Sequence, residues 1–128
     1  MFIRFICGQI NHRSQVPEGL FRAASDLRRS DDLPDYEFEL MANLRDWFSQ
    51  NLDSPFDHLP CHRGHERAVC WFKPTAHEHL ARAWELVAIL ERNDVLIWTI
   101  KSPRVGYVHY EDEVQVFARP YVDVRLLM

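Results

Sequence analysis

The sequence has few glycines, 4 in 128 residues, and no excess of basic side chains. Phosphate-binding loops need closely spaced glycines, as in Gly-x-Gly-x-x-Gly, and no such spacing occurs here. Lysine and arginine number 15 against 19 acidic residues, which gives a net charge of −4. No basic stripe is interleaved with aromatic residues, so the pattern does not indicate a nucleic-acid-binding protein.

Long apolar runs and an even set of cysteines are also missing. The longest strongly apolar run, residues 95–100, is far shorter than the ~20 residues that cross a bilayer. The apolar N-terminus is interrupted by Arg4, unlike a secretory leader. Cys7, Cys61 and Cys70 cannot all pair within the chain, which favours reduced thiols. We therefore expect a cytoplasmic protein that contacts neither membrane nor nucleic acid.

The N-terminal half predicts one strand and two helices. Residues 2–7 are rich in aromatic and β-branched side chains, which is typical of a strand. A loop follows, and Pro17 suits the first turn of a helix because proline loses no helical hydrogen bond there. A second helix is expected from Asp35. The predicted apolar faces of the two helices are Leu20, Ala23, Ala24 and Leu27, then Tyr36, Leu40, Leu44, Trp47 and Phe48.

The remainder of the chain predicts a loop, a third helix and three strands. Prolines and a glycine interrupt residues 51–66, which indicates a long polar loop. Residues 69–72 form a short apolar run, which is expected to be extended. Thr75 and Glu78 have capping-box spacing and predict a helix that ends near Asn93, with Trp84 in its buried stripe. The three predicted strands are residues 95–101, 105–110 and 114–118.

This order of elements predicts a single domain over residues 1–128. The length fits one hydrophobic core. Strands grouped at the C-terminal end pair as hairpins, which gives an antiparallel sheet. The predicted fold class is therefore α+β, in two layers: a mainly antiparallel sheet of about four strands with three helices packed on it.

Several short segments carry a resemblance. They are Trp71-Phe72-Lys73, Glu78-His79-Leu80, Gly106-Tyr107-Val108 and the acidic stretch from Tyr110 to Val116. Together they resemble a scattered group of small bacterial proteins of unknown function, mainly over residues 69–120. The resemblance implies a bacterial, single-domain protein, and it transfers no activity and no catalytic residue.

A histidine- and cysteine-containing segment is the candidate metal site. Zinc is bound by four thiolate or imidazole ligands in a tetrahedron, and His58, Cys61, His62 and His65 have suitable side chains. Their spacing, however, matches no standard zinc finger. We interpret the segment as a solvated loop and expect no metal and no cofactor, with these four residues as the ligands if that interpretation is wrong.

Two enzymatic alternatives stay open. In the first, Cys61 or Cys70 acts as a nucleophile with His62 or His65 as its base. In the second, Glu111 and Glu113 form a Glu-x-Glu segment like that of ADP-ribosyltransferases, with Arg4 as a possible partner. Acidic residues also commonly occupy exposed turns between strands, which is the simpler interpretation.

The preferred hypothesis is a non-enzymatic domain that binds another protein. The chain has more large aromatic side chains than a small core commonly needs, and some are expected to line a groove or a partner surface. The predicted contact surface is the tip of the C-terminal hairpin, where charge reversal of Glu111 and Asp112 is expected to leave stability almost unchanged. Its residues are Tyr107, Tyr110, Glu111, Asp112 and Glu113.

Overall fold

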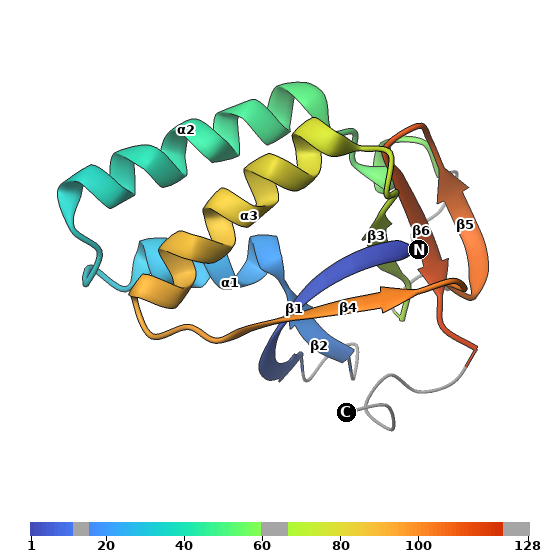
Figure 1. Ribbon diagram of the computed structural model, residues 1–128, viewed down its shortest axis with the longest axis horizontal. Helices are drawn as coiled ribbons and strands as arrows, with labels where there is room; N and C mark the ends of the chain where they lie inside the picture. The colour runs from blue at the N-terminus through green and yellow to red at the C-terminus, as the bar shows by residue number, and fades with distance from the viewer. Residues whose placement is uncertain (12–15, 60–66, 122–128) are drawn as a thin grey trace.

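The computed structural model describes residues 1–11, 16–59 and 67–121 (Figure 1). Six strands, three helices and one short 3-10 helix occur in these segments. In chain order they are β1 (Phe2–Asn11), β2 (Val16–Gly19), α1 (Leu20–Arg29), α2 (Asp35–Asn51), η1 (Pro55–Asp57), β3 (Val69–Phe72), α3 (His77–Arg92), β4 (Ile97–Ser102), β5 (Tyr107–Glu111) and β6 (Gln115–Arg119).

The sheet is built around β1, and all of its strand pairs are antiparallel. The path β2-β1-β3-β6-β5 contains five strands, and β4 pairs with β1 in addition. This confirms an α+β fold with three helices and an antiparallel sheet, although the strands outnumber the predicted four. The extra pairing arises because β1 continues to Asn11 and forms a hairpin with β2.

That hairpin corrects the predicted start of the first helix. Pro17 does not open a helix: it lies in β2, opposite Ile10 of β1. Proline is tolerated in a strand at the edge of a sheet, where its missing N–H leaves no ladder bond unmade. The helix begins at Leu20 instead, and its predicted buried face is confirmed for Leu20, Ala23 and Leu27.

The buried stripe of α2 confirms Leu44 and Phe48 but differs from the predicted one in the first half of the helix. Tyr36 and Leu40 are exposed, at 65% and 47%, although both were expected to be buried. The stripe runs through Met41, Leu44 and Phe48 and includes Glu37, which is 3% exposed. Glu37 occupies this apolar face because its carboxylate accepts hydrogen bonds from Arg92 Nε at 2.8 Å and Asn93 Nδ2 at 3.1 Å.

The third helix ends as predicted but begins differently. Its C-cap is Asn93, whereas its N-cap is Ala76, and no side chain caps it within the described residues. The capping-box prediction is wrong because Thr75 lies in a tight turn, where its carbonyl accepts from the N–H of His77 at 2.9 Å. Trp84, predicted to be buried, is 48% exposed, since the stripe runs through its neighbours Ala83 and Val87.

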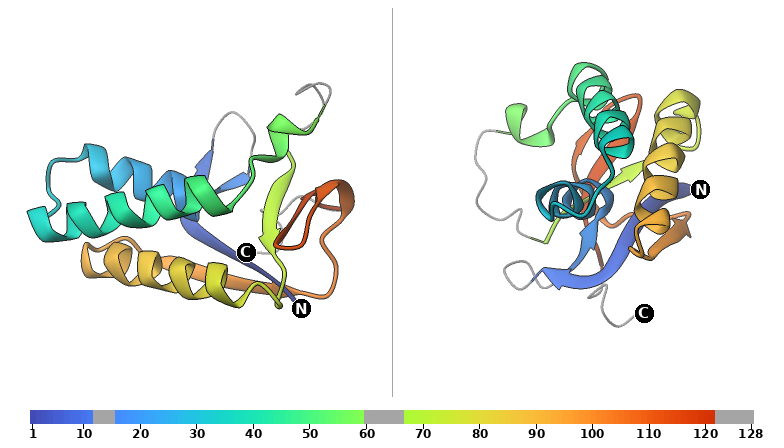
Figure 2. Two further views of the ribbon diagram at one scale, coloured as in Figure 1. Left: turned by 90° about the horizontal axis from the view of Figure 1, so that it is seen from above. Right: turned by 90° about the vertical axis from the view of Figure 1, so that its left-hand side faces the viewer.

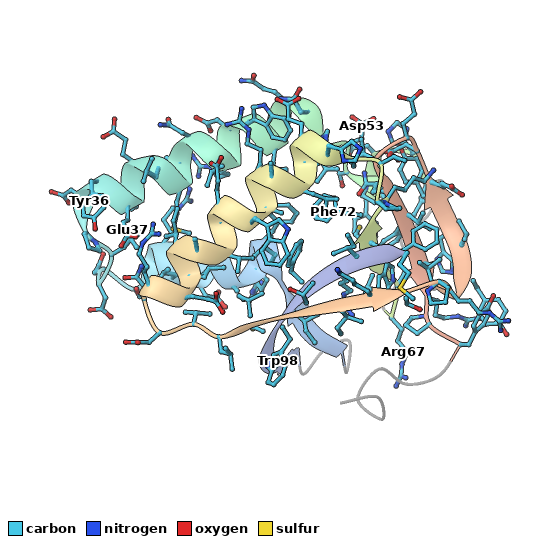
Figure 3. The ribbon with its side chains drawn as sticks, in the orientation of Figure 1. Tyr36, Glu37, Asp53, Arg67, Phe72 and Trp98 are labelled. Carbon is cyan, nitrogen blue, oxygen red and sulfur yellow. The ribbon has the colours of Figure 1, made fainter. Side chains whose placement is uncertain are left out.

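The three helices form a group beside β1 and β4, and β3, β6 and β5 stand at the other end of the molecule (Figures 1 and 2). The main core joins buried residues of all three helices to Phe5, Cys7, Phe72 and Ile97 of the sheet. Trp98 projects from β4 away from the helices (Figure 3) and is 56% exposed. Within the described residues, no helix has the length and apolar character of a membrane span.

Candidate functional site

A cavity of about 710 Å³ lies between the helices and the strands at the far end. Its walls come from α1, α2 and η1 on one side and from β1, β3 and β6 on the other. In Figure 3, Phe72 lies in the interior between the helices and the strands, and Asp53 lies just beyond the C-terminal end of α2. Both residues line the cavity.

The cavity exists because β1 and β3 diverge. Only one residue pair joins these two strands, Ile3 with Phe72. From Ile6 onward β1 pairs with β2, while β3 continues along β6 from Phe72 back to Val69. The gap that opens between the strands is bounded by α1, α2 and η1, which contribute lining side chains.

Aromatic side chains make up much of the wall. Phe21 of α1 packs edge-on against Phe48 of α2, with ring centroids 4.9 Å apart. Phe56 of η1 packs in the same way against Phe117 of β6, at 5.3 Å. Edge-to-face pairs of this kind stabilise a fixed geometry. Since Phe21 and Phe56 are still 42% and 40% exposed, part of each ring is left uncovered at the cavity.

Arg4 lines the same cavity and is only 5% exposed. Burial lowers the pKa of its guanidinium from the usual value to about 10, an effect that the nearby Cys70 partly offsets. Arg4 therefore remains a cation at neutral pH.

Cys70 also lines the cavity. Alternation along β3 buries Val69 and Trp71, whereas Cys70 is exposed. Part of the residue is exposed, but protein atoms surround most of the thiol, and this burial raises the pKa of the thiol to about 12 despite the opposing effect of Arg4. The thiolate is the nucleophilic form of cysteine, so this environment does not activate Cys70.

The hairpin tip holds the predicted contact residues in different environments. Tyr107 is 54% exposed and contacts Tyr121, with ring centroids 4.8 Å apart. Tyr110 stacks on the imidazole of His58 at 4.9 Å, and its hydroxyl donates to Asp112 Oδ2 at 3.0 Å. Glu113 is exposed. The tip is thus partly ordered by contacts with the segment that follows α2.

Asp112 is a structural residue of the turn. Its Oδ1 accepts from the backbone N–H groups of Val114 at 2.8 Å and Gln115 at 2.9 Å. Burial alone would raise its pKa, but these bonds and those from Gln115 Nε2 and the Tyr110 hydroxyl outweigh it and hold the pKa below the usual value. Because these hydrogen bonds give Asp112 a structural role in the turn, we now expect its charge reversal to lower stability, in contrast to the expectation from the sequence.

The Glu-x-Glu segment lies apart from the cavity. Glu111 forms an ion pair with Lys73, with Nζ and Oε2 2.6 Å apart. Neither Glu111 nor Glu113 is among the residues that line the cavity, whereas Arg4 is. The structure thus does not bring together the three side chains of the ADP-ribosyltransferase-like hypothesis.

The predicted histidine and cysteine loop is only partly covered by the described residues. His58 Nε2 lies 3.3 Å from Asp53 Oδ2, and Cys61, His62 and His65 lie outside the described residues. Among residues 1–11, 16–59 and 67–121, no group of three or more histidine, cysteine or acidic side chains is arranged to hold a metal ion.

The cavity itself was not predicted from the sequence. Two signals pointed toward it: the surplus of large aromatic residues, and a charged Arg4 within an apolar strand. Phe48, Phe56, Trp71 and Phe72 do line the cavity. Their convergence depends on the divergence of β1 and β3, a tertiary feature that sequence periodicity does not report.

Comparison of the chain with protein-family models, with curated proteins and with solved structures finds no match. The resemblance of residues 69–120 to small bacterial proteins therefore stays a prediction, and the function has to be inferred from the site.

Proposed function

We propose that this chain is a non-enzymatic binding domain whose site is the cavity between α1, α2, η1 and the diverging strands β1 and β3. The observation that carries the proposal is a cavity of about 710 Å³ with predominantly aromatic and aliphatic walls. Ligand pockets in proteins typically measure about 300–1,000 Å³, with apolar walls and a few placed polar groups. The guest we propose is a small molecule with a largely apolar surface.

The chemistry of the lining favours binding over catalysis. An enzyme needs an activated nucleophile or a pair of groups with matched pKa values next to the substrate. The pKa of the Cys70 thiol is raised to about 12, which opposes activation. The only carboxylate among the described lining residues is Asp53, whose side chain is 67% exposed and faces His58.

A dye-binding experiment tests this proposal. Nile red is neutral and apolar, and we expect its fluorescence to rise on saturable binding to the purified protein. Ser49 is exposed and lines the cavity, so Ser49→Trp should obstruct the cavity and weaken binding by about tenfold or more. Gln50→Trp is the matched control, since Gln50 follows Ser49 on the same helix, is exposed and does not line the cavity.

Two results would contradict the proposal. One is the absence of saturable dye binding by a folded protein. The other is equal weakening by the Ser49 and Gln50 variants, which would place the dye outside the cavity. A second obstructing variant, Ala24→Phe, removes dependence on a single position, because Ala24 lines the cavity from α1.

Contact with a protein partner through the hairpin tip is the second candidate function. Exposed Tyr107 and Val108, at 54% and 52%, lie on the same hairpin as the acidic Glu111 and Glu113. Aromatic side chains provide binding energy in protein interfaces, and charges at the rim increase association rates. Glu111→Lys should slow association with a partner captured from the host. Equal association rates of this variant and the parent would remove the tip from the interface.

A further inference from the structure

Three strands form edges of the sheet in the described parts of the chain, and two of these edges carry features that oppose pairing with another strand. β2 has four residues and contains Pro17, which cannot donate a ladder hydrogen bond. β5 shifts its register against β6 between Val108 and Tyr110, and a bulge of this kind twists an edge away from a second strand. The third edge strand, β4, has neither a proline nor a register shift.

The edge of β4 is regular, and exposed side chains follow it. Its register with β1 is unbroken over six residue pairs, and β1 is its one strand partner among the described residues. Seen from above, β4 lies on the side of β1 opposite to β2 (Figure 2). Leu96 and Trp98 are 60% and 56% exposed, and Thr99 is also exposed. A regular edge with unpaired backbone groups is a template for another strand.

Alternation along β4 restricts how a second copy of this strand can pair with it. Ile97 belongs to the main core, whereas Trp98 projects away from the helices (Figure 3) and Ile100 packs against a second, smaller apolar cluster. Opposite residues of antiparallel strands point to the same face of a sheet, so a two-fold axis must pass through a residue and not between two residues. An axis at Thr99 places Trp98 opposite the second copy's Ile100 and leaves Pro103 outside the paired segment.

The charges at the two ends of β4 complement each other under the same axis. Exposed Glu91 and Asp94 precede the strand. Exposed Lys101 lies near its end, and exposed Arg104 follows it. Antiparallel pairing about Thr99 brings the acidic end of each copy toward the basic end of the other, because Asp94 and Arg104 are equally far from Thr99 in sequence. A parallel arrangement would instead bring like charges together, which is unfavourable.

From the regular edge, the exposed apolar side chains and the charge pattern, we infer that β4 pairs antiparallel with β4 of a second copy of this chain. The two-fold axis passes at Thr99, and the sheets of the two copies join into one. Such an interface is isologous, since the same patch serves on both copies. An extended peptide would use the same backbone groups, but a charge pattern that complements itself favours a second copy. No residue of β4 lines the cavity, so the inference is independent of the proposed function.

Sedimentation velocity of the full chain over a wide range of protein concentration tests the inference. We expect the mass to rise with concentration from 15.2 kDa, the mass of one chain, toward twice that value. Added salt should weaken the association, because the charged ends of β4 contribute to it.

Charge substitutions at the axis identify the edge. Thr99→Lys places two lysines next to each other across the axis and should weaken dimerisation by about tenfold or more, and Thr99→Glu should do the same. An equimolar mixture of the two variants should dimerise again, because lysine then faces glutamate. Val108→Lys and Val108→Glu are the matched controls on the edge strand β5, where Val108 is 52% exposed, and should dimerise as the parent does.

Hydrogen exchange of the parent gives a measurement that needs no variant. Amides of β4 should exchange more slowly at high than at low protein concentration, whereas those of β5 should not change. If the Thr99 variants do not fold, this comparison decides the question.

Three results would overturn the inference. One is a parent protein that keeps the mass of one chain at the highest concentration. Another is a dimer that Thr99→Lys does not weaken, or a Lys and Glu mixture that dimerises no better than either variant alone. The third is a loss of dimerisation in Val108→Lys but not in Thr99→Lys, which would place the contact at β5.

Discussion

At the scale of single residues, Asp112 in the β5–β6 turn has the clearest structural role. Sequence composition identifies an acidic turn but does not distinguish its three carboxylates. The structure does, because Asp112 accepts from two backbone N–H groups, Glu111 pairs with Lys73, and Glu113 is exposed. A carboxylate bonded to successive backbone N–H groups fixes the turn geometry, which the other two do not.

We predict that Asp112→Ala lowers the free energy of unfolding by about 1–3 kcal/mol, because it leaves partly buried donors without their acceptor. Glu113→Ala should change it by less than about 0.5 kcal/mol. Since the pKa of Asp112 is lowered by folding, its contribution is present above the unfolded pKa of about 3.9 and is lost as the pH falls below it. Urea unfolding across this range tests both statements; a gap between parent and variant that does not narrow in acid would contradict the role of the ionised carboxylate.

A second residue-scale prediction concerns Cys70. With its pKa raised to about 12, alkylation by iodoacetamide at neutral pH should be roughly a hundredfold slower than for an ordinary exposed thiol, after allowing for the higher nucleophilicity of a basic thiolate. The measurement uses a Cys61→Ser background and identifies the labelled site by mass spectrometry. Rapid labelling at neutral pH would contradict the neutral thiol and would revive the nucleophile hypothesis.

At the scale of elements, the bounds of the helices were predicted to within a few residues, but the buried face of each helix was predicted only in part. The apolar residues of α2 occupy more than one face, so apolar spacing alone selected Tyr36 and Leu40. The buried stripe includes Glu37, a charged residue that no hydrophobic pattern selects. Its pKa is lowered mainly by hydrogen bonds from Arg92 and then Asn93. Residues distant in sequence thus decide which face of α2 is buried.

The revised face of α3 gives a test at this scale. Leu90 is fully buried, whereas Trp84 is 48% exposed and packs edge-on against Phe5 at 4.9 Å. Leu90→Ala should lower the free energy of unfolding by about 2–5 kcal/mol. Trp84→Ala should lower it less, since it chiefly removes one aromatic contact, typically about 0.5–1.5 kcal/mol. Denaturant midpoints check the ranking, and a larger loss for Trp84→Ala would show that α3 is rotated relative to this description.

The strands show where local pattern suffices and where it does not. Strands β3, β4, β5 and β6 begin and end within about two residues of the predicted ranges, because their β-branched and aromatic runs are continuous. The β1–β2 hairpin was missed because Pro17 is also a good helix N-terminal residue. The single pairing of Ile3 with Phe72 and the divergence beyond it have no local signature at all.

At the scale of the whole molecule, the core and the cavity divide the interior. Residues such as Phe5, Phe48 and Phe72 belong to both, since they pack in the main core and line the cavity. The core therefore fixes the walls of the cavity before any guest enters. A preformed cavity binds with a small ordering cost, which is the usual condition for tight binding of a small molecule.

The most direct test of a cavity-binding domain is a crystal structure of the full chain grown with ω-bromodecanoate. The account predicts one strong anomalous bromine peak between α1, α2 and η1, near Phe21, Phe48 and Phe56. Bromine found only on the outer surface at saturating ligand, with the cavity empty, would contradict the claim that this cavity is the binding site.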